Sequence, residues 1–390
     1  GEAGTVFGLA DEPHRQRQVG AEWSTSSGNM LLYGLPGSGT TTALSTIAIG
    51  LCRDNEPDRM HLYLLDFDDQ QLRPLRCLPH VGAVVGGSER ERQVRLLRRL
   101  ADELQRRRDM VAADPAGLAG HPVVVTMLDN YAAFAGCFDS PGEATVRDLL
   151  TRLVADGPGV GMLTMITAKQ PGDTPSRLAS LVGAKLGFRL ADRYEYSVLG
   201  IPAVDPPQIA GRAFESGTGR EIQVAVAHSN GLDAAIAEIA WPKPHVAPWS
   251  IDVLPQDVAV ADFIGAGRIS TDEWFLPVGI GDSTLSPVGL VLRDGEHALV
   301  TGPARSGKST ALMTLAAVAR TASPRVRISA VIPRRSPLAS SPEVNQVIAA
   351  EEISRLGETD GPHLLLVDDA ELTDAASPLG SLIRERRPGI

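Results

Sequence analysis

Short apolar runs alternate along the chain with longer segments of helical spacing. The apolar runs predict strands at residues 62–67, 123–128 and 162–167, and again at 326–332 and 363–367. Near-continuous apolar strands joined by helices are typical of a parallel sheet, because each crossover connection places a helix on one face. The pattern therefore predicts an α/β fold with mainly parallel sheets that are covered by helices on both faces.

A glycine-rich segment at residues 302–309 lies between an apolar run and a helix-forming run. Its sequence, Gly-Pro-Ala-Arg-Ser-Gly-Lys-Ser, fits the phosphate-loop pattern G-x-x-x-x-G-K-[ST] in full. Residues 298–300 before it predict a strand, and residues 310–319 after it predict a helix. In such a loop the main-chain N–H groups and the helix N-terminus bind phosphate, lysine reaches the terminal phosphates and the hydroxyl binds Mg²⁺. The complete loop, which includes Lys308, therefore predicts a binding site for ATP and Mg²⁺.

A second copy of this arrangement, at residues 34–41, lacks the lysine. Its sequence, Gly-Leu-Pro-Gly-Ser-Gly-Thr-Thr, follows a predicted strand at 30–33 and precedes a predicted helix at 42–48, with Thr40 at the lysine position. Two interpretations stay open: the loop binds nucleotide without the lysine, or it survives as a structural turn. The predicted nucleotide-binding residues are Gly302, Arg305, Ser306, Gly307, Lys308, Ser309 and Thr310 in the complete loop, and Gly34, Gly37, Ser38, Gly39, Thr40, Thr41 and Thr42 in the other.

Two acidic residues at a strand end are the predicted metal ligand and the predicted water-polarising residue of the complete site. Asp368 and Asp369 follow the apolar run 363–367, and Asp368 is the predicted partner of the Ser309 hydroxyl in holding magnesium. Asp369 occupies the position where a glutamate usually polarises water. Because its side chain is one methylene shorter, we expect binding with slow turnover. The alternative for both residues is that a strand-terminal aspartate caps a turn.

The first copy carries Asp129 and Asn130 at the corresponding strand end. Asp129 and Thr41 are its predicted metal ligands, with turn capping as the alternative for Asp129. An amide cannot act as a base, so with Thr40 also present we expect no catalysis there. Gln170, which follows the next strand, is a candidate contact to a terminal phosphate, although a polar turn residue would have the same pattern.

The repeated loop indicates tandem duplication of a whole α/β domain. Related lead-ins precede both loops, Gly-Leu-Ala-Asp at 8–11 and Gly-Ile-Gly-Asp at 279–282. Nothing in the second copy corresponds to residues 160–199, so we expect its C-terminal half to be absent from this chain. The predicted divisions are a degenerate first domain at 1–240, a stiff proline-rich linker at 241–256 and a second domain at 257–390.

The net charge of the chain limits the classes of molecule that it is expected to bind. A formal net charge of −10 argues against a broad nucleic-acid surface, which needs clustered positive charge. The arginine-rich stretch 89–108 mixes charges of both signs with apolar residues and is interpreted as a solvated amphipathic helix.

The cysteines Cys52, Cys77 and Cys137 are widely separated in the sequence, which predicts neither a disulfide framework nor a zinc site. Because no run of 18 apolar residues occurs, we expect a soluble chain with no membrane span.

Several segments resemble those of FtsK/SpoIIIE-type ATPases. They are Tyr-Leu-Leu-Asp-Phe at 63–67, Leu-Pro-His-Val-Gly at 78–82, Ala-Lys-Gln-Pro at 168–171, Phe-Arg-Leu at 188–190 and Leu-Gly at 199–200. The tandem loops, the lead-ins and the proline-rich segment resemble most the second and third ATPase domains of the EccC group, the membrane-bound motors of type VII secretion. The resemblance spans essentially all 390 residues and implies tandem P-loop NTPase domains of the RecA/FtsK-like type.

The resemblance also implies partners. EccC proteins recognise C-terminal signal segments of small helical WXG-type export substrates, work with other secretion-system subunits and can form homo-oligomers when substrate binds. It implies a regulatory or docking role at the cytoplasmic side of the cell membrane, for a piece of a membrane-anchored parent protein. We expect the groove for a substrate helix in the second copy or its lead-in. Two other hypotheses stay open: a DNA translocase, which the acidic balance disfavours, and a nucleotide-stabilised scaffold without turnover.

Overall fold

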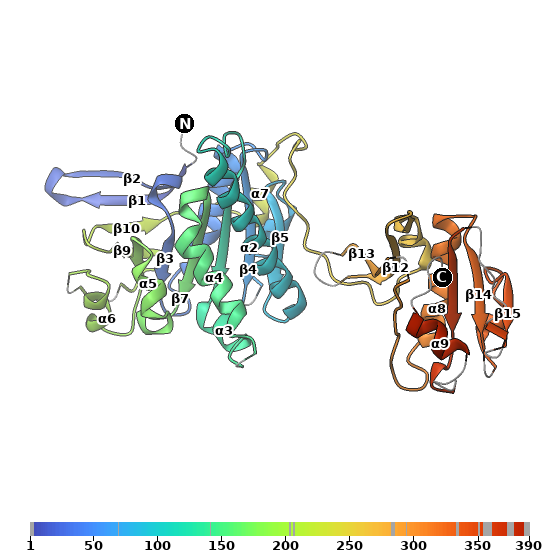
Figure 1. Ribbon diagram of the computed structural model, residues 1–390. Helices are drawn as coiled ribbons and strands as arrows, with labels where there is room; N and C mark the ends of the chain where they lie inside the picture. The colour runs from blue at the N-terminus through green and yellow to red at the C-terminus, as the bar shows by residue number, and fades with distance from the viewer. Residues whose placement is uncertain are drawn as a thin grey trace. The chain divides into compact units, whose positions relative to one another are not determined.

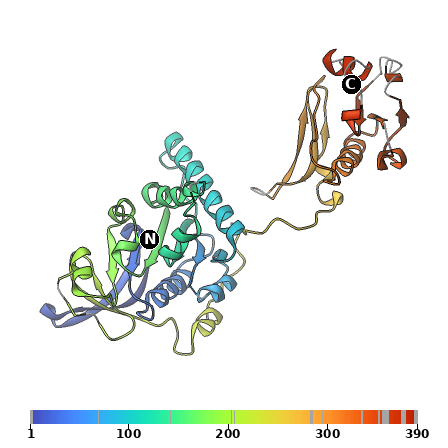
Figure 2. The same cartoon turned by 90° about the horizontal axis from the view of Figure 1, so that it is seen from below.

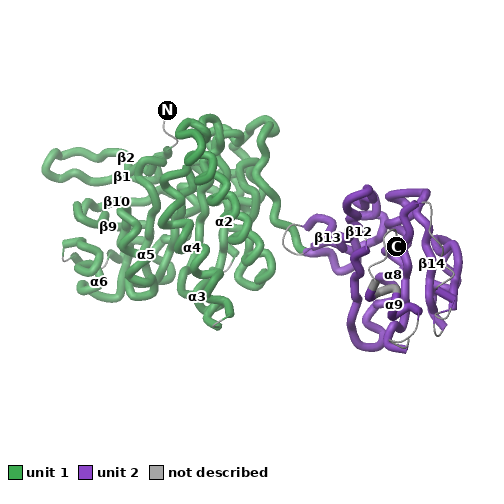
Figure 3. The backbone as a smooth tube through the Cα atoms, in the orientation of Figure 1, with its two compact units in different colours: residues 1–253 green, residues 254–390 purple. Residues whose placement is uncertain are grey.

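The chain folds into two compact units, residues 1–253 and 254–390 (Figure 3). The computed structural model describes residues 4–68, 70–140, 142–202, 204–205, 207–281, 285–293, 295–332, 335–349, 352–353, 361–372 and 378–385. Within these ranges no helix combines the length and the apolar character needed to cross a bilayer.

The described part of unit 1 is built on a ten-stranded sheet with the order β2-β1-β10-β9-β8-β3-β7-β6-β4-β5 (Figure 1). The strands from β8 to β5 run parallel, and those from β2 to β8 pair antiparallel. The strands are β1 (Gly4–Glu12), β2 (Arg17–Ser24), β3 (Met30–Tyr33), β4 (Met60–Asp66), β5 (Val81–Gly86), β6 (Val123–Asp129), β7 (Met162–Ala168), β8 (Ala184–Gly187), β9 (Arg212–Glu215) and β10 (Glu221–Val224). The helices are α1 (Thr40–Asp54), α2 (Arg90–Ala113), α3 (Tyr131–Cys137), α4 (Ala144–Asp156), α5 (Ser176–Ser180), α6 (Arg193–Val198) and α7 (Leu232–Ala237).

This sheet is buried on both faces because consecutive residues of its central strands are apolar and point to opposite sides. In β4, Tyr63 and Leu65 belong to the core that includes α2, α3 and α4, whereas Leu62 and Leu64 belong to the core that includes α1 and α7. The views in Figures 1 and 2 show helices on both sides of the sheet. The predicted α/β class is confirmed, and β4, β6 and β7 begin and end within two residues of the predicted strands.

The arginine-rich helix α2 is not solvated along its whole charged surface, and the prediction is corrected in that respect. The helix itself forms, but Arg107 and Glu103 are only 3% and 5% exposed, with 2.6 Å between Arg107 Nε and Glu103 Oε1. Arg107 also donates to the main-chain oxygens of Val160 and Pro122. A buried charge pair is tolerated only when its remaining donors are also satisfied. These bonds therefore tie α2 to the loops that flank β6 and β7.

Unit 2 contains two small sheets among its described residues. Strand β12 pairs antiparallel with β11 and β13, and β14 pairs parallel with β15 and β16. The strands are β11 (Arg268–Ile269), β12 (Trp274–Ile280), β13 (Pro287–Leu292), β14 (Arg327–Val331), β15 (Gln346–Ile348) and β16 (His363–Val367), and the helices are α8 (Lys308–Ala322) and α9 (Pro378–Glu385). Asp282, the last residue of the second lead-in, lies outside the described residues.

The strand predicted at 298–300 does not form, and that prediction is wrong. Residues 298–300 have no strand conformation, and Leu299 is 80% exposed. In unit 1 the matching strand β3 pairs with β7 on one side and with β8 on the other. No strand in the described part of unit 2 pairs with 298–300. An apolar run without a neighbouring strand has no ladder of main-chain hydrogen bonds, so strand propensity alone does not make it a strand.

The predicted linker is bound to unit 1 along much of its length. Residues 241–252, here called the strap, contain no helix or strand, in keeping with their prolines. The ring of Trp249 stacks on Tyr63 with 5.3 Å between ring centroids, and the Arg99 guanidinium lies 4.7 Å from the centre of the same ring. Trp241 Nε1 donates to the Cys52 main-chain oxygen at 2.6 Å. The strap is therefore part of the surface of unit 1 and not a free spacer.

We expect Trp249→Ala to destabilise unit 1 by roughly 1–3 kcal/mol, because it removes the stacking on Tyr63 and the cation–π contact with Arg99. The measurement is the free energy of unfolding from urea denaturation, followed by circular dichroism. His245→Ala, an exposed position of the same strap, is the matched control and should change stability by less than about 0.5 kcal/mol. Equal stability of the two variants would show that the Trp249 contacts contribute nothing to the stability of unit 1.

Candidate nucleotide-binding site

The first loop is held between two neighbouring strands at the carboxyl end of the parallel sheet. It joins β3 to α1, and its main chain bonds to both flanking strand ends. Gly34 N–H donates to the Ala168 oxygen and Leu35 N–H donates to the Arg189 oxygen, each at 2.9 Å. Ligands of open α/β sheets bind at this edge, where loops from adjacent strands diverge. The predicted strand at 30–33 is confirmed, and the helix extends the predicted one in both directions.

The two glycine loops have nearly the same main-chain geometry. The residue before each helix has a left-handed conformation, with φ 104° and ψ 13° at Gly39 and φ 91° and ψ 11° at Gly307. A Cβ atom at Gly34 would lie 2.4 Å from Ser38 Oγ, and the same atom at Gly302 would lie 2.5 Å from the matching serine. The first loop therefore keeps the shape of the complete one, although its lysine is missing.

The fourth position of each loop also takes a left-handed conformation. Gly37 has φ 75°, which costs glycine little, whereas Arg305 has φ 61° at the matching position. Positive φ is unfavourable for a residue with a side chain, so the second loop carries the strain that the first avoids. The first loop thus has the more relaxed main chain, and the second has the complete set of side chains.

The side chain of Lys308 contacts the main chain of the second loop. Its Nζ donates to the main-chain oxygens of Gly302 at 2.9 Å and Pro303 at 3.1 Å. In the first loop the side chain of Thr40 points the same way, because its Cγ2 lies 3.0 Å from where a Gly34 Cβ would be. Thr40 is too short to bring a donor to the terminal phosphates.

The predicted metal ligands of the first site are in contact. Thr41 Oγ1 donates to Asp129 Oδ2 at 2.8 Å, and Thr167 Oγ1 donates to the other carboxylate oxygen at 2.5 Å. Asp129 is 1% exposed, and β6 places it beside Asp66 of β4. Burial raises the pKa of Asp129 to about 6 against the two hydroxyl donors, which lower it. A hydroxyl beside a carboxylate is a donor set that suits Mg²⁺.

The titration of Asp129 gives a pH prediction for the protein without metal. Because the folded-state pKa is raised, the folded chain holds this proton more tightly than the unfolded chain. That contribution to stability is complete below pH ~4 and is lost as the pH rises through about 6. We therefore expect Asp129→Asn to be more stable than the parent above pH 7, by on the order of 3 kcal/mol, and the difference to vanish near pH 4. Urea unfolding of both proteins in EDTA at several pH values measures this, and a pH-independent difference would contradict it.

The second site is less complete on its acidic side. Asp368 is buried, and its carboxylate accepts from Ser336 Oγ at 2.5 Å and from the Asp369 N–H at 3.2 Å. In the described part of the chain no hydrogen bond joins Asp368 to Ser309. Asp369 has φ 49°, and Asn130 at the matching position of unit 1 has φ 69°.

Asn130 and Gln170 have structural partners. Asn130 Oδ1 accepts from the Ala133 N–H at 3.2 Å and so caps α3. Gln170 is exposed two residues after the end of β7, and its main-chain N–H donates to Asp173. Thr42 and Thr310 are exposed in the first turns of α1 and α8.

The sequence patterns did not single out Arg189 or Thr167. Thr167 ends the predicted run 162–167, and its hydroxyl could have been identified only from the pairing of β7 with β6. Arg189 lies in the Phe-Arg-Leu segment after β8, and its NH2 group donates to the Pro36 oxygen of the first loop at 3.0 Å. No sequence pattern predicted that β8 lies beside β3.

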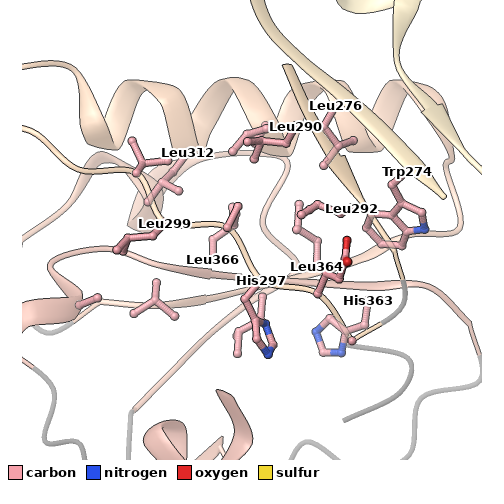
Figure 4. A pocket seen from close by; sticks show the side chains of 18 of the residues that line it. Trp274, Leu276, Leu290, Leu292, His297, Leu299, Leu312, His363, Leu364 and Leu366 are labelled. Carbon is pink, nitrogen blue, oxygen red and sulfur yellow. The ribbon is translucent and has the colours of Figure 1, made fainter. Parts of the chain in front are cut away.

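A cavity of about 1330 Å³ opens beside the second loop (Figure 4). Leu364 and Leu366 of β16 and Leu299 point into it, and Gly302 and Lys308 of the second loop also line it. The strand order β15-β14-β16 matches β5-β4-β6, so the space between β16 and 298–300 corresponds to the one that β7 fills between β6 and β3. The cavity therefore has the apolar walls of a strand position in a parallel sheet.

The sequence of the chain is similar to one protein family and to proteins of ESX secretion systems. The model of the FtsK/SpoIIIE family matches residues 5–215. ESX-1 secretion system protein EccCb1 of Mycobacterium tuberculosis is 25% identical over 98% of this chain and 67% of that protein. ESX-3 secretion system protein EccC3 of the same species is 27% identical over 97% of this chain and 32% of that protein. The chain thus spans about two thirds of one relative and about a third of the other.

Two solved structures share the fold. EccC of Thermomonospora curvata (ATPases 2 and 3), in complex with a signal sequence peptide, has a TM-score of 0.70 and 24% identity, over 99% of this chain and 80% of that chain. EssC of Geobacillus thermodenitrificans (ATPases 2 and 3) has a TM-score of 0.73 and 20% identity, over 90% of this chain and 71% of that chain. The likeness covers both units.

Proposed function

Since this chain belongs to the FtsK/SpoIIIE family, we propose that it is the nucleotide-binding and substrate-docking part of a type VII secretion ATPase. The observation that carries the proposal is the match to ESX secretion proteins over nearly the whole chain, through both glycine loops. The alternative function, a DNA translocase, is disfavoured because the formal net charge of the chain is −10 and binding to DNA phosphates depends on positive charge.

Both loops bind ATP with Mg²⁺ in this proposal. The likeness of their main-chain geometry supports it, since the N–H groups that receive phosphate depend on the main chain and not on lysine. Thr41 and Asp129 would hold the metal at the first loop, and Ser309 and Asp368 at the second. The metal would neutralise charge on the terminal phosphates.

Turnover is absent at the first loop and slow at the second. At the first loop the position of a general base is occupied by Asn130, whose side-chain oxygen caps α3. At the second loop Asp369 supplies a carboxylate, but on a side chain one methylene shorter than glutamate. The first loop would then act as a regulatory site that stays loaded with nucleotide.

The substrate in this proposal is the C-terminal signal segment of a small helical WXG-type export protein. The T. curvata structure with a signal sequence peptide supports it for that protein, and the same two-unit fold is present here. Other secretion-system subunits would be partners, and substrate would promote homo-oligomers. The parent protein would act at the cytoplasmic side of the cell membrane.

The test combines peptide binding with phosphate release. Fluorescent peptides from the C-termini of WXG-type proteins of the source cell are titrated with the full chain, with and without ATP and Mg²⁺, and compared with scrambled peptides. We expect sequence-dependent binding and little phosphate release. Equal binding of signal and scrambled peptides, or stronger binding of duplex DNA than of any peptide, would overturn the secretion assignment. ATP-dependent thermal stabilisation in that event would leave a nucleotide-stabilised scaffold.

A further inference from the structure

The first loop lacks its own cation but has the rest of the phosphate cradle. Thr40 replaces the lysine, while the left-handed positions at Gly37 and Gly39 and the helix start are preserved. Phosphate groups bound at a main-chain nest are strongly stabilised by a nearby guanidinium or ammonium group. A cation from elsewhere in unit 1 would therefore complete the site.

Arg189 lies at the first loop and is fixed there by its neighbours. It follows β8, the strand beside β3, and its main-chain oxygen accepts from the Leu35 N–H at 2.9 Å. Phe188 and Leu190 on either side are 0% and 1% exposed, so the main chain at Arg189 is anchored in the core. Its NH2 group donates to the Pro36 oxygen at 3.0 Å and lies 3.9 Å from the Cβ position of Gly37.

Arg189 and Lys308 make the same kind of contact with their loops. Lys308 Nζ donates to the oxygens of the first two loop residues, Gly302 and Pro303. The Arg189 guanidinium donates to the oxygen of the third residue of its loop, Pro36. In both units a side-chain cation thus donates hydrogen bonds to main-chain oxygens among the first three residues of the loop. Arginine is well suited to phosphate because its planar group presents several donors in a fixed fork.

Lys169 is the rival cation. It is exposed directly after β7, on the other side of β3, and no hydrogen bond joins its Nζ to the first loop in the described structure. Arg212 is engaged elsewhere, because its guanidinium bonds to Gln223 and Glu221. The contacts therefore favour Arg189 over both.

We infer that Arg189 is the phosphate-binding cation of the first nucleotide site, in place of the lysine that Thr40 replaces. This inference rests on the proposed function, in that the first loop must bind nucleotide. On binding, the guanidinium exchanges the Pro36 oxygen for phosphate oxygens. The residue contributes to nucleotide affinity and phosphate discrimination, and it carries no step of hydrolysis.

The test uses the full chain with Lys308→Ala as the parent, so that the first loop reports alone. Fluorescent methylanthraniloyl derivatives of ATP and AMP are titrated with Mg²⁺. We expect Arg189→Ala to weaken ATP binding about tenfold and AMP binding less than about twofold, because the lost contact is to the outer phosphates. Arg189→Lys should retain most of the ATP affinity. Arg53→Ala, which removes a guanidinium at the far end of α1, should change neither affinity.

Each other outcome decides the matter in a different way. If the Lys308→Ala parent binds no ATP, the first loop is not a nucleotide site, and both the proposed function there and this inference fall. If the parent binds ATP and Arg189→Ala binds it equally well, only the inference is overturned. Equal losses for ATP and AMP would mean that Arg189 supports the loop structurally, and a loss confined to Lys169→Ala would assign the role to Lys169. Far-ultraviolet circular dichroism checks that each variant is folded.

Discussion

Lys308→Ala should weaken ATP binding at the second loop by about a hundredfold or more. Its ammonium group donates to two main-chain oxygens of this loop, that of Gly302 at 2.9 Å and that of Pro303 at 3.1 Å. Charge-assisted hydrogen bonds to phosphate are among the strongest that a side chain makes. Isothermal titration calorimetry with ATP and Mg²⁺ on the full chain should show two binding events in the parent, of which one is lost.

Lys243→Ala is the charge-matched control for this experiment. Lys243 is exposed in the strap, away from both loops in the sequence, so its removal should leave both binding events unchanged. If Lys308→Ala retains two events with unchanged affinities, the second loop does not use Lys308 to bind phosphate. The assignment of residues 302–309 as a nucleotide site would then be wrong.

The strands that apolar runs predict are those whose neighbours also form. The predicted strand at 363–367 is β16 to the residue, because its partner β14 is present and apolar. The equally apolar run 298–300 fails for want of a partner strand. Sequence patterns report the propensity of a segment, whereas a strand in a sheet depends on segments far away in the chain. Whether a predicted strand forms is therefore a property of the whole sheet.

The left-handed turns before α1 and α8 could be predicted because the phosphate-loop pattern has glycine and serine at fixed spacing. The residues that surround the two loops could be predicted less well. Strand β8 has only four residues, among them Lys185 and Gly187, and gives no apolar run that could predict it. Its place beside β3, and hence the position of Arg189 at the first loop, follows from the fold alone. In the same way, the capping of α3 by Asn130 depends on a helix that starts at Tyr131.

Thr40→Lys should tighten ATP binding at the first loop by between about tenfold and a hundredfold. The main-chain angles at Gly39 and Gly307 are closely similar, and both Thr40 and Lys308 occupy the first residue of a helix. The new side chain would therefore leave the helix in the direction that Lys308 takes. Titration of fluorescent ATP into the Lys308→Ala parent, with and without Thr40→Lys, measures the gain at this loop alone.

The gain should depend on Arg189, and this dependence is the sharper test. If the guanidinium already neutralises the phosphates, a second cation adds less beside it than it would alone, so Thr40→Lys should raise affinity more in an Arg189→Ala background. Contacts made by two residues to one group are typically non-additive in this way. Gln18→Lys, an exposed position in β2 outside the predicted nucleotide-binding residues, controls for a general increase in positive charge and should give a much smaller gain. Equal gains from Thr40→Lys and Gln18→Lys would show that the first loop has kept its shape without its phosphate-binding role.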